Sequence, residues 1–508
     1  MKNTFTQSMA WLHTWGGLVF GWLLFAIFVT GTLAVFDKEL NHWMQPEIPA
    51  NAVTQADAAQ RAIAYLQAHE PQAGNWGISL PTDRSPGLRV STGERRHGGG
   101  VQLDPQTGEA IEVRDSVGGN FFFRFHFTLD LPRNWGIFVV GALALVMLAA
   151  LVTGIVIHKK IFKEFFTFRP DKGQRSWLDF HNASAVLLLP FHLMITYTGL
   201  VIFMLIYIPA GVDALFAGDN RAYFKAQGNA RLEQPRALAR QPAELVDVVP
   251  LLAEAQARLG PIAGFNIRNP NTAGARIEIR PELGNRIALS KGQAMVFDGV
   301  SGQLLSDVTE WRAAPLTQRV MVGLHFAQFG GYPMRWLYFV CGVISCVMIA
   351  SGLVLFCVKR GRKYASTSAQ LSARRWYRVA EVCNVGFVTG LLLACVGLLW
   401  ASRLLPVELV QREAWEVRAF FGTWLLALLH AGIRPARRAW VEQLGLTALL
   451  CMGLGLFGGL GDALRLGVVA CAMVLGGLLG VVAWRVQQGE QMLHAPRARA
   501  RRSVEAGA

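Results

Sequence analysis

The chain has 508 residues, of which 52% are hydrophobic and only 16% are charged, a composition that indicates a membrane protein. Its formal net charge of +15 could suggest nucleic-acid binding, but the basic residues are concentrated in short segments next to apolar runs. Membrane topology accounts for this whole excess, so no nucleic-acid partner is expected. All seven cysteines lie in or at the ends of apolar runs, which excludes a disulfide framework.

Eight apolar runs of about 20 residues are long enough to cross a bilayer as helices. The first is interpreted as a retained helix, because it is long for the apolar core of a signal peptide and lacks a convincing cleavage site. The predicted fold class is therefore a mainly α membrane protein with about eight transmembrane helices. In chain order the segments are a helix in 1–36, a polar segment 37–134, a helix 135–158, a loop 159–182, a helix 183–208, a polar segment 209–334, a helix 335–358, a basic loop 359–378, a four-helix membrane region 379–484 and a basic tail 485–508. Within 379–484 the apolar runs lie near 379–400, 417–433, 441–460 and 464–484.

Charge predicts the orientation of these helices, because short cytoplasmic loops carry an excess of lysine and arginine. The basic clusters follow the second, fourth, sixth and eighth apolar runs, in 159–175, 359–378, 434–438 and 485–502. Every second connection and both termini are therefore predicted to be cytoplasmic. The polar segments 37–134 and 209–334 then lie on the outer side.

Each outer segment contains a helix-like stretch followed by short strand-like runs. A turn with Asp and a Gly four residues later then recurs, with Asp104 and Gly108 in the first segment and Asp298 and Gly302 in the second. Aspartate caps such a turn through its side chain, and glycine tolerates positive φ. We therefore expect two small α+β modules.

The unit of helix, module and helix occurs twice, in 1–158 and in 177–358. Two units with the same orientation form a parallel repeat about an axis along the membrane normal, which predicts a core of four helices. Histidines and Thr-Gly or Ser-Gly pairs recur in both units at matched intervals. His13 and His181 each stand 17 residues before such a pair, Thr30-Gly31 and Thr198-Gly199, and His126 and His325 stand 27 and 26 residues before Thr153-Gly154 and Ser351-Gly352.

Six of the eleven histidines lie in or at the ends of the first four helices: His13, His126, His158, His181, His192 and His325. Ionisable side chains are costly in a membrane and indicate function there. A single histidine near a helix end is more often a hydrogen-bonding residue than a ligand, but the repeat favours ligation for the four matched histidines. His158 and His192 lack this support, because Phe356 and Leu24 stand at the corresponding positions.

Paired histidines between apolar helices favour a b-type haem. Zinc and non-haem iron sites usually recruit Asp, Glu or Cys, and the first four helices contain almost no carboxylate. His181 and His192, eleven residues apart on one predicted helix, would share a face at two depths about 16 Å apart, which suits two haems. We predict one haem on the cytoplasmic side, at His13 and His181 with His158 available. The other lies on the outer side, at His126 and His325 with His192 available, and the axial pairs are left open.

A GxGxxG pattern, Gly453 to Gly458, lies inside an apolar run, where close helix packing explains it better than a dinucleotide site. No predicted cytoplasmic loop exceeds about 25 residues, so no NAD or flavin domain is expected and electrons must come from a partner.

These motifs resemble the PepSY-associated transmembrane family of bacterial inner-membrane proteins, which includes iron-regulated ferrisiderophore reductases. The resemblance covers about 1–360 and rests on Trp11-Leu12-His13, Phe125-His126-Phe127, Thr153 to Lys160, Asp179-Phe180-His181-Asn182, Pro190-Phe191-His192-Leu193 and Leu324-His325-Phe326. It implies two haem b groups and PepSY-like periplasmic modules. It also implies reduction of Fe(III) in a ferric siderophore on the periplasmic side. The electron donor, a quinol or a cytoplasmic reductase, is left open. The family has four core helices, so 379–484 has no counterpart in it.

The sequence is also compatible with two other functions. The chain could transport iron or an iron chelate, with the histidines as transport ligands. Alternatively, the outer modules could be membrane-anchored binding or inhibitory domains that act on a peptidase, which would leave the matched histidines unexplained.

Overall fold

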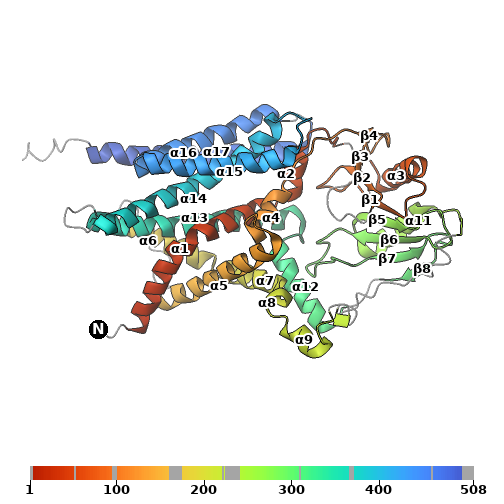
Figure 1. Cartoon of the computed structure of the whole chain (residues 1–508), viewed down its shortest axis with the longest axis horizontal. Helices are drawn as coiled ribbons and strands as arrows, with labels where there is room; N and C mark the ends of the chain where they lie inside the picture. Colours follow the sequence, from red (N-terminus) through yellow and green to blue (C-terminus); the bar gives the residue numbers. More distant parts are fainter. Residues whose placement is uncertain are drawn as a thin grey trace, which may run out of the picture. The chain divides into compact units, whose positions relative to one another are not determined.

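The computed structural model of the chain describes residues 4–50, 53–93, 100–158, 174–219, 222–223, 241–307, 311–364, 371–458 and 461–494. They form two compact units, whose helices and strands are labelled in Figure 1. The first unit comprises residues up to Phe20 and Ile27–Ile349, and the second comprises Gly21–Ala26 and residues from Ala350 on.

Among the described residues, six helices are long and apolar enough to cross a membrane, and a bent helix pair could make a seventh span. The six are α1 (Phe5–Ala34), α5 (Arg133–Ile157), α13 (Gly331–Tyr364), α14 (Leu371–Leu404), α16 (Ala436–Gly453) and α17 (Ala463–His494). The chain is thus a mainly helical, multi-pass membrane protein. The remaining predicted run, 417–433, lies in α15 (Arg412–Ile433), whose first two turns carry two arginines and two glutamates that lower its hydropathy.

The bent pair is α6 (Gln174–Leu187) and α7 (Leu189–Ile202), which meet at 63°. Pro190 stands in the first turn of α7, where its missing N–H and its ring prevent α6 from continuing as one straight helix. The prediction that His181 and His192 share one face of a straight helix is therefore wrong. Helix α6 also begins inside the predicted loop 159–182, of which 159–173 lies outside the described residues.

Two further helices immediately precede α5 and α13 and were not predicted. Helix α4 (Asn120–Thr128) is capped by Leu129 and helix α12 (Ala313–Phe326) by Ala327, and both cap residues have left-handed backbone, with φ of 52° and 53°. His126 and His325 lie in the last turns of these helices. The shorter helices of the first unit are α2 (Asp37–Met44), α8 (Met204–Tyr207) and α9 (Ala210–Phe216).

The strands of the two polar segments 37–134 and 209–334 form one antiparallel sheet rather than two separate modules. Its eight strands have the order β4-β3-β2-β1-β5-β6-β7-β8. The strands are β1 (Asn75–Ser79), β2 (Leu88–Ser91), β3 (Val101–Leu103), β4 (Ala110–Ile111), β5 (Ile262–Arg268), β6 (Arg276–Pro281), β7 (Met295–Asp298) and β8 (Leu304–Ser306). Strands β1 and β5 join the two halves, with Asn75 opposite Arg268 and Ser79 opposite Gly264. This pairing covers two edges that separate modules would leave exposed.

Both predicted Asp-Gly turns are confirmed. Asp104 Oδ1 accepts from the backbone N–H of Gln106 at 2.7 Å, and Asp298 Oδ1 accepts from that of Val300 at 3.0 Å. Gly108 and Gly302 have φ of 77° and 74°, a conformation that glycine adopts without strain.

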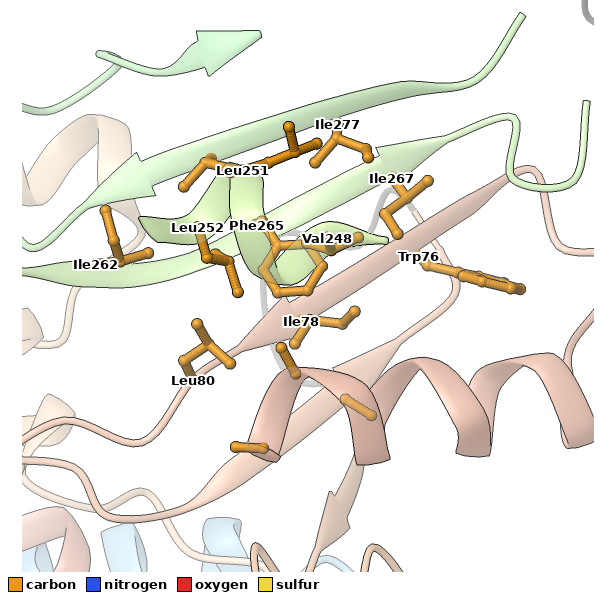
Figure 2. Packing of buried hydrophobic residues seen from close by; sticks show 14 of the residues in the cluster. Trp76, Ile78, Leu80, Val248, Leu251, Leu252, Ile262, Phe265, Ile267 and Ile277 are labelled. Atoms are coloured by element: carbon orange, nitrogen blue, oxygen red, sulfur yellow. The ribbon is translucent and has the colours of Figure 1, made fainter. Parts of the chain in front are cut away.

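The core of the sheet is built from alternate strand residues and from two helices, α3 (Gln55–His69) and α11 (Val248–Leu259). Phe265 of β5 is fully buried, and Figure 2 shows side chains of α11 and β1, including Leu252 and Ile78, gathered around it. Alternation along each strand places these apolar side chains on one face.

Replacing Phe265 with alanine is expected to destabilise the first unit by about 3–5 kcal/mol, because the change removes a buried ring and leaves a cavity. Chemical denaturation of the full-length protein, followed by tryptophan fluorescence, measures the change. Leu305→Ala on β8, where the leucine is 38% exposed, serves as the control and should stay within about 0.5 kcal/mol. Equal effects of the two substitutions would contradict the assignment of Phe265 to the core.

The second unit contains α14, α15, α16 and α17. Arg412 and Glu416, one turn apart on α15, form an ion pair that is fully buried. At the other end of α15, His430 Nε2 lies 2.8 Å from Glu442 Oε2. A Cβ on Gly453 would lie 2.8 Å from the ring of Trp400, so the first glycine of the GxGxxG pattern lies at a close contact between helices α16 and α14, as predicted.

Candidate functional site

Four of the six predicted histidines form two pairs inside the first unit. His13 of α1 and His181 of α6 have ring centroids 6.4 Å apart, with the ring planes at 73°. We name them the first pair. His126 of α4 and His325 of α12 have ring centroids 6.0 Å apart, with the planes at 36°. We name them the second pair. Each pair joins one histidine from before residue 158 with one from after residue 177.

The ring nitrogen Nδ1 of each paired histidine lies within hydrogen-bond distance of a backbone carbonyl of a neighbouring helix. The contacts are His13 to Ala150 at 3.0 Å, His126 to Ile27 at 2.8 Å, His181 to Met348 at 2.9 Å and His325 to Ile195 at 3.0 Å. A carbonyl oxygen can only accept, so Nδ1 carries the proton in all four rings and donates. The lone pair is then on Nε2, the atom available to a metal.

Within each half of the chain the anchoring is reciprocal. His13 of α1 donates to α5, while His126, which precedes α5, donates to α1. In the second half, His181 of α6 donates to α13, while His325, which precedes α13, donates to α7. Each pair therefore brings together two imidazoles whose orientations are set by different helices.

The imidazoles of the second pair are held in the neutral form. Burial lowers the pKa of His126 and outweighs the opposite effect of its hydrogen bond to Ile27. Burial, with the nearby His126, also lowers the pKa of His325. Neutral imidazole is the form that coordinates a metal.

The separation of the rings is that expected for two imidazoles on one metal. Two metal–nitrogen bonds of about 2 Å, with about 1 Å from each nitrogen to its ring centre, place the centroids about 6 Å apart. Among the described residues, no three His, Cys, Asp or Glu side chains are grouped so that they could hold a metal ion. Each pair can thus supply two nitrogen ligands to a metal.

The other two predicted histidines do not belong to either pair. His192 of α7 is fully buried, with Nε2 at 2.8 Å from Ser345 Oγ of α13 and its ring 6.4 Å from that of Phe28. His158 follows the last residue of α5, where its backbone N–H donates to the carbonyl of Gly154, and its side chain is half-buried.

Sequence reasoning missed the four carbonyl acceptors and the helices α4 and α12. A backbone carbonyl has no residue-specific signal. The Thr-Gly and Ser-Gly pairs were visible in the sequence, but their relation to the histidines required the helix pairing.

Comparison with known proteins assigns this region to a family. The family model described as the PepSY-associated TM region matches residues 10–359, more than half of the chain. No curated protein matches the chain. The matched stretch runs from α1 into α13 and contains both histidine pairs as well as His158 and His192. As the sequence motifs predicted, the chain belongs to the family of the PepSY-associated transmembrane region.

Proposed function

We propose that this protein is a b-type haem transmembrane electron-transfer protein that reduces ferric siderophore on the periplasmic side and so releases Fe(II). The observation that carries the proposal is the pair of bis-histidine sites, each with Nδ1 anchored and Nε2 available. Haem would bring its other iron ligands with it, so each site would need to supply only its two imidazoles.

The first pair, His13 and His181, would hold one haem, and the second pair, His126 and His325, the other. Haem b supplies one-electron transfer when it is bound. The protein's own residues orient the imidazoles and keep them in an apolar setting. His192, whose Nε2 contacts Ser345, and His158 belong to neither pair and are assigned no haem.

The two sites are well separated along the helices. His13 lies on α1, and the carbonyl that anchors His126 is that of Ile27 on the same helix, fourteen residues later. At 1.5 Å per residue this is about 21 Å along the axis. Two haems at these levels would lie near opposite faces of a membrane.

The proposed topology supports the direction of transfer. It comprises eight spans including α15, a bacterial inner-membrane location with both termini cytoplasmic, and a four-helix core built by a parallel repeat. The two halves of the eight-stranded sheet are then PepSY-like periplasmic modules. Electrons from a quinol or a cytoplasmic reductase would enter near the first pair, and the second pair would be next to the periplasm.

The reaction is a one-electron reduction: Fe(III) in the chelate accepts an electron and becomes Fe(II). Hard siderophore oxygens bind Fe(II) far less tightly than Fe(III), so the metal is released without breaking a covalent bond of the chelator. The electron donor loses one electron for each Fe(III) that is reduced.

An absorption spectrum of the purified full-length protein tests the proposal. Dithionite reduction should give a b-type band with two haems per chain, and addition of ferric siderophores should reoxidise it while an Fe(II) chelator traps the product. The same siderophores loaded with gallium(III), which this electron transfer does not reduce, are the control and should leave the band unchanged. A protein without a b-type band would overturn the proposal, and chelate uptake into vesicles without reductant would favour a transporter.

A further inference from the structure

The four carbonyls that anchor the paired histidines occupy one position in a repeated sequence pattern. Each lies three residues before the hydroxyl residue of a Thr-Gly or Ser-Gly pair. Ile27 precedes Thr30-Gly31, Ala150 precedes Thr153-Gly154, Ile195 precedes Thr198-Gly199 and Met348 precedes Ser351-Gly352. The repeated pairs therefore mark where a histidine ring meets a neighbouring helix.

The glycine of the pair provides room for the ring. A Cβ on Gly31 would lie 2.6 Å from His126 Nδ1, and one on Gly199 would lie 2.9 Å from His325 Cε1. At Gly154 the distance to His13 Cε1 would be 3.3 Å. Contacts under about 3 Å require the ring to move. Glycine inside a helix costs about 1 kcal/mol relative to alanine, and the close approach of each ring gives a reason for that cost.

The hydroxyl of the pair adds a second acceptor. Thr153 Oγ1 donates to the carbonyl of Ala149 at 2.8 Å, and its oxygen lies 3.1 Å from His13 Nδ1. Thr198 Oγ1 donates to the carbonyl of Met194 at 2.7 Å, and its oxygen lies 3.1 Å from His325 Nδ1. Because each hydroxyl uses its proton on its own helix, it can accept from the imidazole N–H. That N–H is shared between a carbonyl and a hydroxyl.

We infer that the Thr-Gly pairs are positioning elements for the haem ligands, in which Gly31, Gly154 and Gly199 set the ring position and Thr153 and Thr198 set the electron donation of the imidazole. The inference rests on the proposed function and assigns residues to it beyond the histidines. Second acceptors on a ligating histidine orient the ring and raise its basicity.

A glycine-to-alanine series in the full-length protein tests the positioning role. Haem content per chain should fall most for Gly31→Ala, less for Gly199→Ala and least for Gly154→Ala, in the order of the three Cβ distances. Gly422→Ala on α15 and Gly467→Ala on α17 are matched controls, since a Cβ at either helical position meets nothing within 4 Å, and both should retain wild-type haem content. Alanine is the better helix former, so helix destabilisation would not explain a loss.

Threonine substitutions test the electronic role. Thr153→Val and Thr198→Val should each shift the midpoint potential of one haem upward, because the imidazole N–H loses an acceptor and becomes a poorer donor to the metal. Thr153→Ser and Thr198→Ser keep the hydroxyl and should restore the wild-type potential. Thr196→Val is the control, since Thr196 lies on α7 and has no hydrogen bond to a histidine among the described residues.

The outcomes separate the two proposals. A wild-type protein without haem would overturn the proposed function. A wild-type protein with two haems, together with full haem content in Gly31→Ala and Gly199→Ala, would overturn the positioning inference alone. Unchanged potentials in both valine variants, or serine variants that fail to restore the potential, would overturn the electronic role.

Discussion

Replacing His13 or His181 with alanine is expected to lower haem content from two per chain to one, and replacing His126 or His325 should remove the other haem. The ring centroids are 6.4 Å apart in the first pair and 6.0 Å apart in the second, so under the proposed function each substitution would remove one of the two ligands at a single haem site. Pyridine haemochrome content and the reduced spectrum measure the loss. The remaining haem should be the same one in His13→Ala and His181→Ala.

Methionine at the same positions separates ligation from packing. His13→Met and His325→Met keep a ligand that haem iron accepts, so haem should be retained with a raised midpoint potential. His69→Ala, an exposed histidine on α3, is the control. His192→Ala and His158→Ala should keep both haems. A loss of haem in His192→Ala equal to that in His181→Ala would contradict the assignment of the pairs.

The second large effect is expected at a buried ion pair in the first unit. Arg84, in the connection between β1 and β2, bonds Glu39 of α2 through Nε at 2.7 Å and Nη2 at 2.6 Å, and both side chains are less than a tenth exposed. Arg84 also donates to the carbonyl of Val35 at 3.1 Å, and Tyr332 at the start of α13 donates to Glu39 at 3.1 Å. These contacts link the sheet to α1, α2 and α13.

Arg84→Met is expected to destabilise the first unit by about 3–5 kcal/mol, because it leaves the Glu39 carboxylate buried without its partner. Denaturation of the full-length protein measures the change. Arg258→Met is the control, since Arg258 pairs with Glu254 and Asp307 at side chains that are 39–52% exposed, and should cost less than about 1 kcal/mol. The double variant Arg84→Met with Glu39→Gln should recover part of the loss. A cost for Arg84→Met similar to that of the control would contradict this assignment.

The Arg84–Glu39 ion pair makes the stability of the first unit depend on pH. Burial alone would raise the pKa of Glu39, but the Arg84 guanidinium holds it below its ordinary value. A carboxyl whose pKa is lowered in the folded state contributes its full stabilisation above its unfolded pKa of about 4.3. This stabilisation is lost as the pH falls through the pKa of the folded state. The loss of stability below pH 4 should therefore be smaller in the double variant than in the wild type.

Local patterns in the sequence predicted a large part of the fold. The membrane helices follow from apolar runs, and the turns at Asp104 and Asp298 follow from side-chain capping, which involves neighbouring residues only. The bend between α6 and α7 has a visible cause in Pro190, although the apolar run 183–208 predicts one continuous helix across it. The shared sheet had no such signal, because β1 and β5 are separated by almost 190 residues and pair through backbone groups.

For the candidate site, the family, the four matched histidines and their intervals to the Thr-Gly and Ser-Gly pairs could be predicted from the sequence, because a repeat is a pattern of residue types. The pairing of His13 with His181 and of His126 with His325 depends on helix packing and could not be predicted, nor could the contact of His192 with Ser345 in place of a paired ring. The tertiary structure also decided which nitrogen of each ring is available. That choice depends on backbone carbonyls such as those of Ala150 and Ile27, which any residue carries and which only helix packing brings to the imidazole.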